Sequence, residues 1–473
     1  MDVLMFQLVQ QLRRLLENDG FFNILLLLIL LGVAVHTFLF RKSHRFPPGP
    51  FSWPIVGNLL ILGKSPHIKL ANLAKQYGPL MYLRLGSVNT LVASSPAMAK
   101  EFLKNHDHVF QYRPPLLLVQ IVGNNSTFGI ISGSTWRFVK KLCSNELFTM
   151  KQLQYCGVGT NKKEAKWFKE INAAIMHWAG AFIVADYIPY LKWVSKLQGV
   201  TASLQRLQIQ ISSFIPKIID EHRNAPLTTN ASIHDRAKDF VDVLIATRGE
   251  NGIGYLSNEA IQDIIVDMLV GGIGSIVGTL EWAMAELLLE PNIMKHAQKG
   301  LDNLVGTNRL VEESDLQDLP YIRAILKETF RLHPPAPFLV PHHCIEACQV
   351  EGYTIPANTR VIVNVWAIGR DPNTWENPLK FDPDRFMKHP EIDVQGQDFS
   401  LLPFGSGRRG CPGRSFGMLV VQIMLARILQ SFDWSLPSNQ HDLDMSERFG
   451  LDLKKAEALC AMAHPRLPSH FYH

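Results

Sequence analysis

The stretch that decides the fold is Phe404-Gly-Ser-Gly-Arg-Arg-Gly-Cys-Pro-Gly413, in the C-terminal part of the chain. Its glycines allow backbone amides to approach the sulfur of Cys411. A helix that begins just beyond Gly413 would point its positive end at the same sulfur. Both effects favour the charged thiolate, whereas the alternative interpretation is a buried and inert cysteine.

The same stretch also satisfies a dinucleotide-binding pattern, Gly-x-Gly-x-x-Gly, at Gly405, Gly407 and Gly410. It follows an apolar run, and Asp433 stands at the distance expected for a ribose-binding acid. A dinucleotide fold needs several βαβ units around its first glycine loop, however, and too little chain follows here. The context therefore disfavours a nucleotide site.

Five positions fit the stricter pattern Phe-x-x-Gly-x-Arg-x-Cys-x-Gly, which ordinary residue usage would produce about once in ten thousand chains. The segment resembles the cysteine-ligand loop of the cytochrome P450 superfamily. Three further segments are similar to those of plant microsomal members that act on specialised metabolites: Tyr77 to Leu80, Trp282 to Glu286 and Leu453 to Ala456. The resemblance implies haem b as the cofactor and Cys411 as the thiolate ligand of its iron. Such a ligand pushes electron density onto iron and promotes O–O cleavage. The loop residues expected beside the haem are Phe404, Gly405, Gly407, Arg409 and Gly413.

Other segments resemble further parts of the same family. Trp136 and Lys140 match its Trp-x-x-x-Arg, with lysine in place of arginine, and His342 matches another propionate-contacting position. Lysine loses the forked geometry of a guanidinium. Glu328, Arg331 and Arg385 match the trio that locks the segment beneath the haem, which is a structural role because a buried charged cluster is destroyed by losing any member.

A glycine-rich helix is expected from Ser257, which can cap it, to Pro291, which stops it. Its centre holds Gly271, Gly272, Gly274 and Gly278, which favours either the close approach of something flat or close packing of another helix. By resemblance, Gly271 to Ser275 is the oxygen-activation segment, with Gly272 beside the haem and Gly274 and Ser275 at the catalytic positions. Gly274 stands where the family usually has an acid, and Ser275 replaces a threonine that helps to deliver protons. Serine can still donate a hydrogen bond, but an acid-supported relay must be rebuilt from water or lost.

The resemblance implies a monooxygenase that inserts one atom of dioxygen into a hydrophobic or phenolic small molecule. Electrons would come from a separate NADPH–cytochrome P450 reductase, docked where Arg137, Lys141, Arg408 and Arg414 supply positive charge. Two alternatives stay open: a haem-thiolate isomerase or dehydratase, and a haem-binding protein without catalytic activity. The residues expected to contact substrate are Leu116 to Val122, Ile273, Ile276, Pro337, Phe338 and Val340.

Residues 21–40 form an apolar stretch without a charge, long enough to cross a membrane once. Arg41, Lys42 and Arg45 follow it, so the positive-inside rule favours a cytosolic body. We expect a non-cytosolic segment (1–20), a transmembrane anchor (21–40) and a basic, proline-rich hinge (41–56). A single haem-binding domain (57–473) would follow. The resemblance implies location in the endoplasmic reticulum membrane. Because the body is expected in the cytosol, which lacks the glycosylation machinery, the sequons at Asn124, Asn125 and Asn230 are expected to be unmodified.

The amino-acid composition excludes few classes of protein. The 47 basic and 42 acidic side chains leave a net charge of +5 without a basic run, so no nucleic-acid partner is expected. Six cysteines in 473 residues favour a reducing compartment over a disulfide framework. The predicted fold is mainly α with small β-sheets: a hairpin from Leu80 to Val92 and strands near Val350 to Val363. Between Leu153 and Lys162 the chain omits roughly two helices of ordinary length relative to the family.

Overall fold

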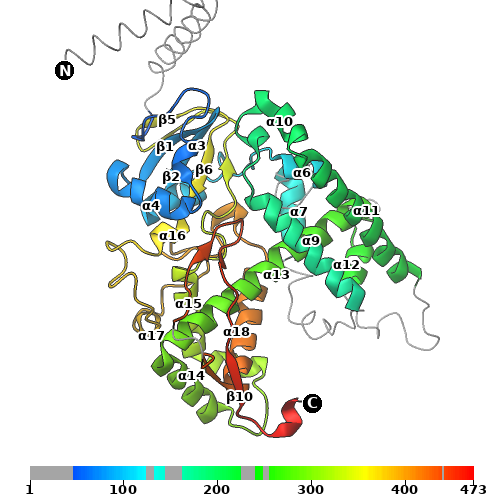
Figure 1. Cartoon of the computed structure of the whole chain (residues 1–473), viewed down its shortest axis with the longest axis vertical. Coiled ribbons are helices and arrows are strands. Elements are labelled where there is room, and N and C mark those ends of the chain that lie inside the picture. The colour runs from blue at the N-terminus through cyan, green and yellow to red at the C-terminus, as the bar shows by residue number, and fades with distance from the viewer. Residues whose placement is uncertain are drawn as a thin grey trace, which may run out of the picture.

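The computed structural model describes residues 46–123, 133–143, 162–224, 240–248, 255–438 and 442–472. Helices dominate it, and the strands form small sheets (Figure 1), so the predicted class is confirmed. The helices are α3 (Leu59–Leu62), α4 (Pro66–Tyr77), α5 (Pro96–Lys100), α6 (Leu117–Val122), α7 (Gly133–Leu142), α9 (Lys162–Gly180), α10 (Lys192–Leu197), α11 (Val200–Asn224), α12 (Phe240–Ala246), α13 (Asn258–Leu289), α14 (Pro291–Leu304), α15 (Pro320–Leu332), α16 (Val365–Ile368), α17 (Asp384–Lys388) and α18 (Arg414–Ser431). Short π or 3-10 turns include η1 (Glu101–Asn105), η5 (Glu313–Asp318) and η6 (Gly407–Arg409).

The largest sheet in the described part of the chain has four strands in the order β1-β2-β6-β3. The expected hairpin is present as β1 (Leu80–Leu85) and β2 (Val88–Ala93), which pair antiparallel. Gly86 has a φ of 64° in their turn, a conformation that glycine adopts without strain. β6 (Arg360–Val363) lies parallel to β2 and antiparallel to β3 (His342–His343).

The remaining strands form two-stranded sheets. β4 (Cys348–Val350) pairs with β5 (Tyr353–Ile355), so the strands expected near Val350 to Val363 are confirmed. β7 (Phe432–Ser435) pairs with β10 (Met462–Pro465), and β8 (Glu447–Arg448) pairs with β9 (Lys454–Lys455). The β8–β9 hairpin contacts α13 through β9.

Helix α13 runs through the centre of the molecule (Figure 1). The predicted signals act as expected at both ends: the Ser257 hydroxyl accepts a hydrogen bond from the Ala260 amide at 3.2 Å, and Pro291 follows the last turn. α13 packs against α9, α11, α15 and α18. Among the described residues it is the one helix long and apolar enough to cross a membrane, but these packing partners make it the central helix of the fold.

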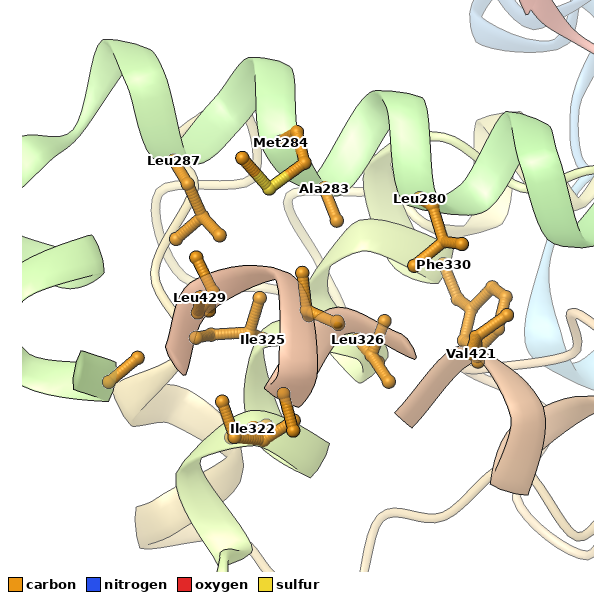
Figure 2. Packing of buried hydrophobic residues seen from close by; sticks show 14 of the residues in the cluster. Leu280, Ala283, Met284, Leu287, Ile322, Ile325, Leu326, Phe330, Val421 and Leu429 are labelled. Carbon is orange, nitrogen blue, oxygen red and sulfur yellow. The ribbon is translucent and has the colours of Figure 1, made fainter. Parts of the chain in front are cut away.

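Two hydrophobic clusters meet on α13. Leu280 and Leu287 on its C-terminal half face α15 and α18, and Figure 2 shows this packing from close by. Ile261 and Ile265 on its N-terminal half pack with α9 and α11 instead. The middle of α13, where the glycines lie, is therefore held at a fixed place between the two clusters.

The predicted anchor (21–40), the shortened region near 153–162 and the three glycosylation sequons lie outside the described residues. The described chain passes from α7 to α9, and those predictions remain untested.

Candidate active site

The loop that carries Cys411 closes on itself before α18 begins. The Cys411 amide donates to the Phe404 carbonyl at 2.8 Å, and η6 occupies the intervening residues. Gly405 and Gly407 have φ values of 63° and 65°, in the left-handed region that favours glycine. A side chain at Gly407 would collide with the carbonyl of Leu103 in η1, so the loop can lie against η1 only with glycine there.

The surroundings of Cys411 act on its thiol in opposite directions. Burial raises the pKa of Cys411 above its usual value, although the Gly413 amide, Arg414 and Lys140 all lower it. The expected contribution from the start of α18 is thus present but smaller than the cost of burying a charge. Because a thiolate at this position needs further compensation, a bound cation such as iron would complete the site.

Helix α7 packs directly on this loop. Trp136 is 5% exposed, and its indole Nε1 donates to the Arg408 carbonyl at 3.0 Å. Lys140 Nζ donates to the same carbonyl at 3.1 Å. The Arg409 guanidinium lies 4.4 Å from the centroid of the Trp136 ring. The two predicted positions on α7 and the arginine of the loop therefore meet.

A second group of polar side chains, which includes Arg113 and His342, comes from the segment before α6 and from β3. His342 Nδ1 lies 2.8 Å from the Phe110 carbonyl, and Arg409 Nε donates to the Gln111 carbonyl at 2.5 Å. Arg113 Nη1 donates to the carbonyls of Val340 and Pro341, at 2.5 and 3.1 Å. The segment from Phe110 to Arg113 thus joins β3 to the cysteine loop.

These side chains are crowded and poorly solvated. Burial, followed by repulsion from Arg409, lowers the pKa of Arg113 to about 9. Burial and the neighbouring Arg113 lower the pKa of His342 well below its usual value. The Arg113 Nε atom is buried without a hydrogen-bond partner in the described structure. Such a set fits an anionic group, and the two carboxylates of haem would accept from it.

The glycines of α13 divide into two kinds. A Cβ atom at Gly271, Gly272 or Gly278 would have nothing within 4 Å, so no described helix packs closely there. Of the two interpretations, open space for something flat fits these three positions and helix packing does not. Gly274 differs, because a Cβ there would lie 2.8 Å from Asp452 Oδ2. Ser275 Oγ donates to the Gly271 carbonyl at 2.7 Å.

Comparison with known proteins agrees with this geometry. A family model described as cytochrome P450 matches residues 47–160 and 156–460. The chain belongs to the cytochrome P450 family. It is a haem-thiolate monooxygenase with haem b as its cofactor. When bound, the haem supplies the activation of dioxygen, and Cys411, the cations and the open face of α13 are the parts of this P450 that would hold it.

Its relatives include flavonoid hydroxylases from plants. It is 37% identical to a flavonoid 3',5'-hydroxylase of Eustoma exaltatum subsp. russellianum, over 91% of this chain and 93% of that protein. It is 36% identical to a flavonoid 3'-monooxygenase of Petunia hybrida, over 92% and 95%. A zebra fish cytochrome P450 solved with abiraterone has a TM-score of 0.66 at 26% identity, covering 85% of this chain and 100% of that one.

The P450 trio predicted beneath the haem lies together in the structure. Arg331 donates to both carboxylate oxygens of Glu328 at 2.7 Å, and Arg385 Nε donates to Glu328 Oε1 at 3.0 Å. Glu328 is fully buried and Arg331 is 1% exposed. Arg331 also donates to the Gly369 and Pro378 carbonyls, each at 2.6 Å. The trio ties α15 to the segment that leads into α17.

Five of the predicted substrate contacts differ in their exposure. Ile273 and Val340 are 42% and 40% exposed. Ile276 instead packs against the core between α13, α15 and α18, and Pro337 is buried. Phe338 lies edge-on to Phe449 at 5.3 Å between ring centroids. Ile273 and Val340 are thus the most exposed of these five, and the predicted contacts, Leu116 to Val122 included, remain predictions.

Sequence reasoning missed Arg113 and Asp452. Arg113 stands in an irregular segment, and Asp452 in a hairpin turn, so neither lies in a recognisable motif. Both act through contacts with residues far away in the chain, for which one sequence carries no local signal.

Proposed function

We propose that this P450 hydroxylates a flavonoid or a closely related phenolic compound. The observation that carries the proposal is its identity to two kinds of flavonoid hydroxylase, which extends over nine-tenths of the chain rather than over the haem loop alone. The apolar surface expected at the site suits a planar aromatic substrate. Apolar contacts discriminate weakly between similar molecules, since a methylene is worth about 1–3 kcal/mol.

The first test is the presence of thiolate-ligated haem. The purified protein, reduced under carbon monoxide, is expected to show the red-shifted absorbance band that a thiolate ligand gives, and Cys411→Ala is expected to lose it. Cys344→Ala is the control, because Cys344 is a buried free cysteine in another part of the fold. A band unchanged in Cys411→Ala would refute the proposed ligand.

The second test concerns the reaction. With a plant NADPH–cytochrome P450 reductase, NADPH and the flavanone naringenin, we expect a product heavier by one oxygen atom, labelled when ¹⁸O₂ is supplied. Product that forms without NADPH would favour an isomerase or dehydratase instead. A haem-loaded protein that converts no member of a phenolic panel would favour the inactive alternative.

We also propose that the reductase docks on the cysteine side of the haem. Arg137 and Lys141 are exposed on α7, which packs on the loop carrying Arg408, and Arg414 begins α18. Arg408 is partly neutralised by Asp107 at 3.2 Å. Arg137 and Lys141 on α7 are therefore the main source of positive charge on this surface. Positive charge here would steer an acidic partner.

Charge reversal tests this docking surface. Lys141→Glu is expected to slow the reduction of the haem by the reductase and to weaken its dependence on salt. Lys299→Glu on α14, which is also exposed, is the control and is expected to change neither. Equal reduction rates in both variants would rule out the surface on α7.

Residues 21–40 are proposed to anchor the protein in the endoplasmic reticulum membrane, with 41–56 as the hinge and the P450 domain in the cytosol. The support is the length and apolarity of the segment and the basic residues after it. Removal of residues 1–40 is expected to release the protein from the membrane fraction, and continued sedimentation with membranes would contradict a single anchor.

A further inference from the structure

The space beside Gly274 is filled by a carboxylate from another part of the chain. A Cβ atom at position 274 would lie 2.8 Å from Asp452 Oδ2 and 3.5 Å from Met176 Cε. Gly274 is buried, and Asp452 lies in the turn between β8 and β9. An acid is therefore present against the catalytic segment of α13, although α13 itself carries none at that position.

Asp452 is held in place by its neighbours. The Leu453 amide donates to the Pro335 carbonyl at 2.8 Å, and the Leu453 carbonyl accepts from Trp282 Nε1 at 3.1 Å. The amide and the carbonyl of Leu453 are thus both hydrogen-bonded to the core, and the carbonyl is bonded to α13 itself. The Asp452 side chain is 14% exposed, and Lys454 Nζ lies 2.8 Å from its Oδ2. This ion pair stabilises the charged carboxylate, and its Oδ2 has no hydrogen-bond partner in the described structure.

We propose that Asp452 takes over, from the β8–β9 hairpin, the role of the acid that α13 lacks at Gly274. It would hold the water through which protons pass from solvent to the Ser275 hydroxyl. Each oxygen on this route gives up one proton as it accepts another, so Asp452 and Ser275 end unchanged. Because Asp452 acts through water and Ser275, it is a positioning residue.

The proposal also accounts for glycine at 274. Any side chain there would displace the carboxylate, which is the far end of a flexible side chain and so would move. Glycine inside a helix costs about 1 kcal/mol against alanine, and room for Asp452 is a compensating reason. The glycine at position 274 leaves room for the Asp452 carboxylate, and Asp452 in turn supplies the acid that α13 lacks.

The test moves the acid back to α13. Asp452→Ala, Gly274→Asp and the double variant are compared with the parent protein, using the plant reductase, NADPH and naringenin. Hydrogen peroxide released per NADPH measures the share of electrons that reduce dioxygen without oxidising the substrate. We expect Asp452→Ala to lower product per NADPH about tenfold or more, and the double variant to restore much of it. Unchanged coupling in Asp452→Ala, or a double variant no better coupled than Asp452→Ala, would overturn the proposal.

Thermal unfolding supplies a readout that needs no turnover. Gly274→Asp alone is expected to lower the unfolding midpoint, because two carboxylates would compete for one space, and Asp452→Ala in the same chain should relieve this loss. Additive effects would show that the two positions do not share that space, which would also overturn the proposal.

Lys454→Met separates the role of the carboxylate from that of the ion pair. It removes the cation but keeps Asp452, so we expect a lower unfolding midpoint with coupling largely retained. If Lys454→Met uncouples as strongly as Asp452→Ala, the hairpin acts only through packing and the proposal fails. The inference rests on monooxygenase activity but not on flavonoids as substrates: if the parent does not convert naringenin, the flavonoid proposal fails, whereas peroxide per NADPH and the unfolding midpoints still judge Asp452.

Discussion

The Glu328 carboxylate accepts hydrogen bonds from three groups, namely the two arginines of the buried trio and one backbone amide. Two come from Arg331, and Oε1 also accepts from Arg385 Nε and from the Asp382 amide at 2.8 Å. Taking such charges out of water is compensated only while every partner is present. The carboxylate therefore fixes the approach of the segment that leads into α17.

Glu328→Gln is expected to destabilise the protein by about 3–5 kcal/mol, because two buried guanidinium groups lose their counter-charge. Chemical unfolding at pH 7 measures this loss. Glu313→Gln is the control, since Glu313 in η5 is only partly buried, and it should change stability little. A Glu328→Gln protein as stable as the parent would show that the trio adds no net stability.

A substitution of Arg113 tests whether this residue helps to hold the haem. Arg113→Met removes a partly desolvated cation whose pKa burial lowers to about 9, and it also removes an anion donor. We expect faster loss of haem from this variant, measured by transfer to apomyoglobin, with a smaller effect on the unfolding of the haem-free chain. Arg84→Met on β1 is the control, and equal haem loss from both variants would contradict a propionate role for Arg113.

At the scale of elements, the β8–β9 hairpin is joined to the body by a buried polar network around Glu447. His67 on α4 and Trp366 on α16 lie 2.7 and 3.1 Å from its carboxylate oxygens, and Arg370 lies 3.7 Å away. Burial raises the pKa of Glu447, but the nearby His333 at 3.8 Å, the hydrogen bond with His67 and the charge of Arg370 outweigh it, so the pKa lies below its usual value.

This network predicts sensitivity to acid. A carboxyl whose pKa is lowered in the folded state stabilises the protein above its unfolded value of 4.5, and this contribution is lost as the pH falls below that value. Glu447→Gln is expected to reduce stability at pH 7 and to flatten the fall in stability between about pH 5 and pH 3. Unfolding midpoints across this range provide the measurement, and parallel curves for the two proteins would contradict it.

Elements with local signals were predictable from sequence. The β1–β2 hairpin has its glycine turn, and α13 has a serine cap and a proline stop, so both appear where expected. The partners of Gly274 and Glu447 could not be predicted, because those contacts join segments far apart in the chain. The same holds for the glycines of α13. Their spacing is compatible with either a flat ligand or a packed helix, and only the three-dimensional structure shows that Gly271 faces open space whereas Gly274 faces Asp452.

At the scale of the whole molecule, α13 is apolar on more than one side. Its C-terminal half packs on α15 and α18, as Figure 2 shows, yet Val277 is 59% exposed and Met424 on α18 is 43% exposed. The family model matches this P450 in two parts that overlap at residues 156–160, where the sequence predicts a shortening. Fewer covering helices would leave such apolar side chains in contact with water.

The end of α9 meets the turn of the β8–β9 hairpin as bare backbone on backbone: a Cβ at Gly180 would lie 2.8 Å from the Gly450 Cα. Because no side chain separates the two backbones, a displacement of α9 is transmitted to the hairpin turn. The same helix lines a small apolar cavity through Trp167 and Ile171. A shift of α9 would consequently also move this turn and the acid two residues beyond Gly450.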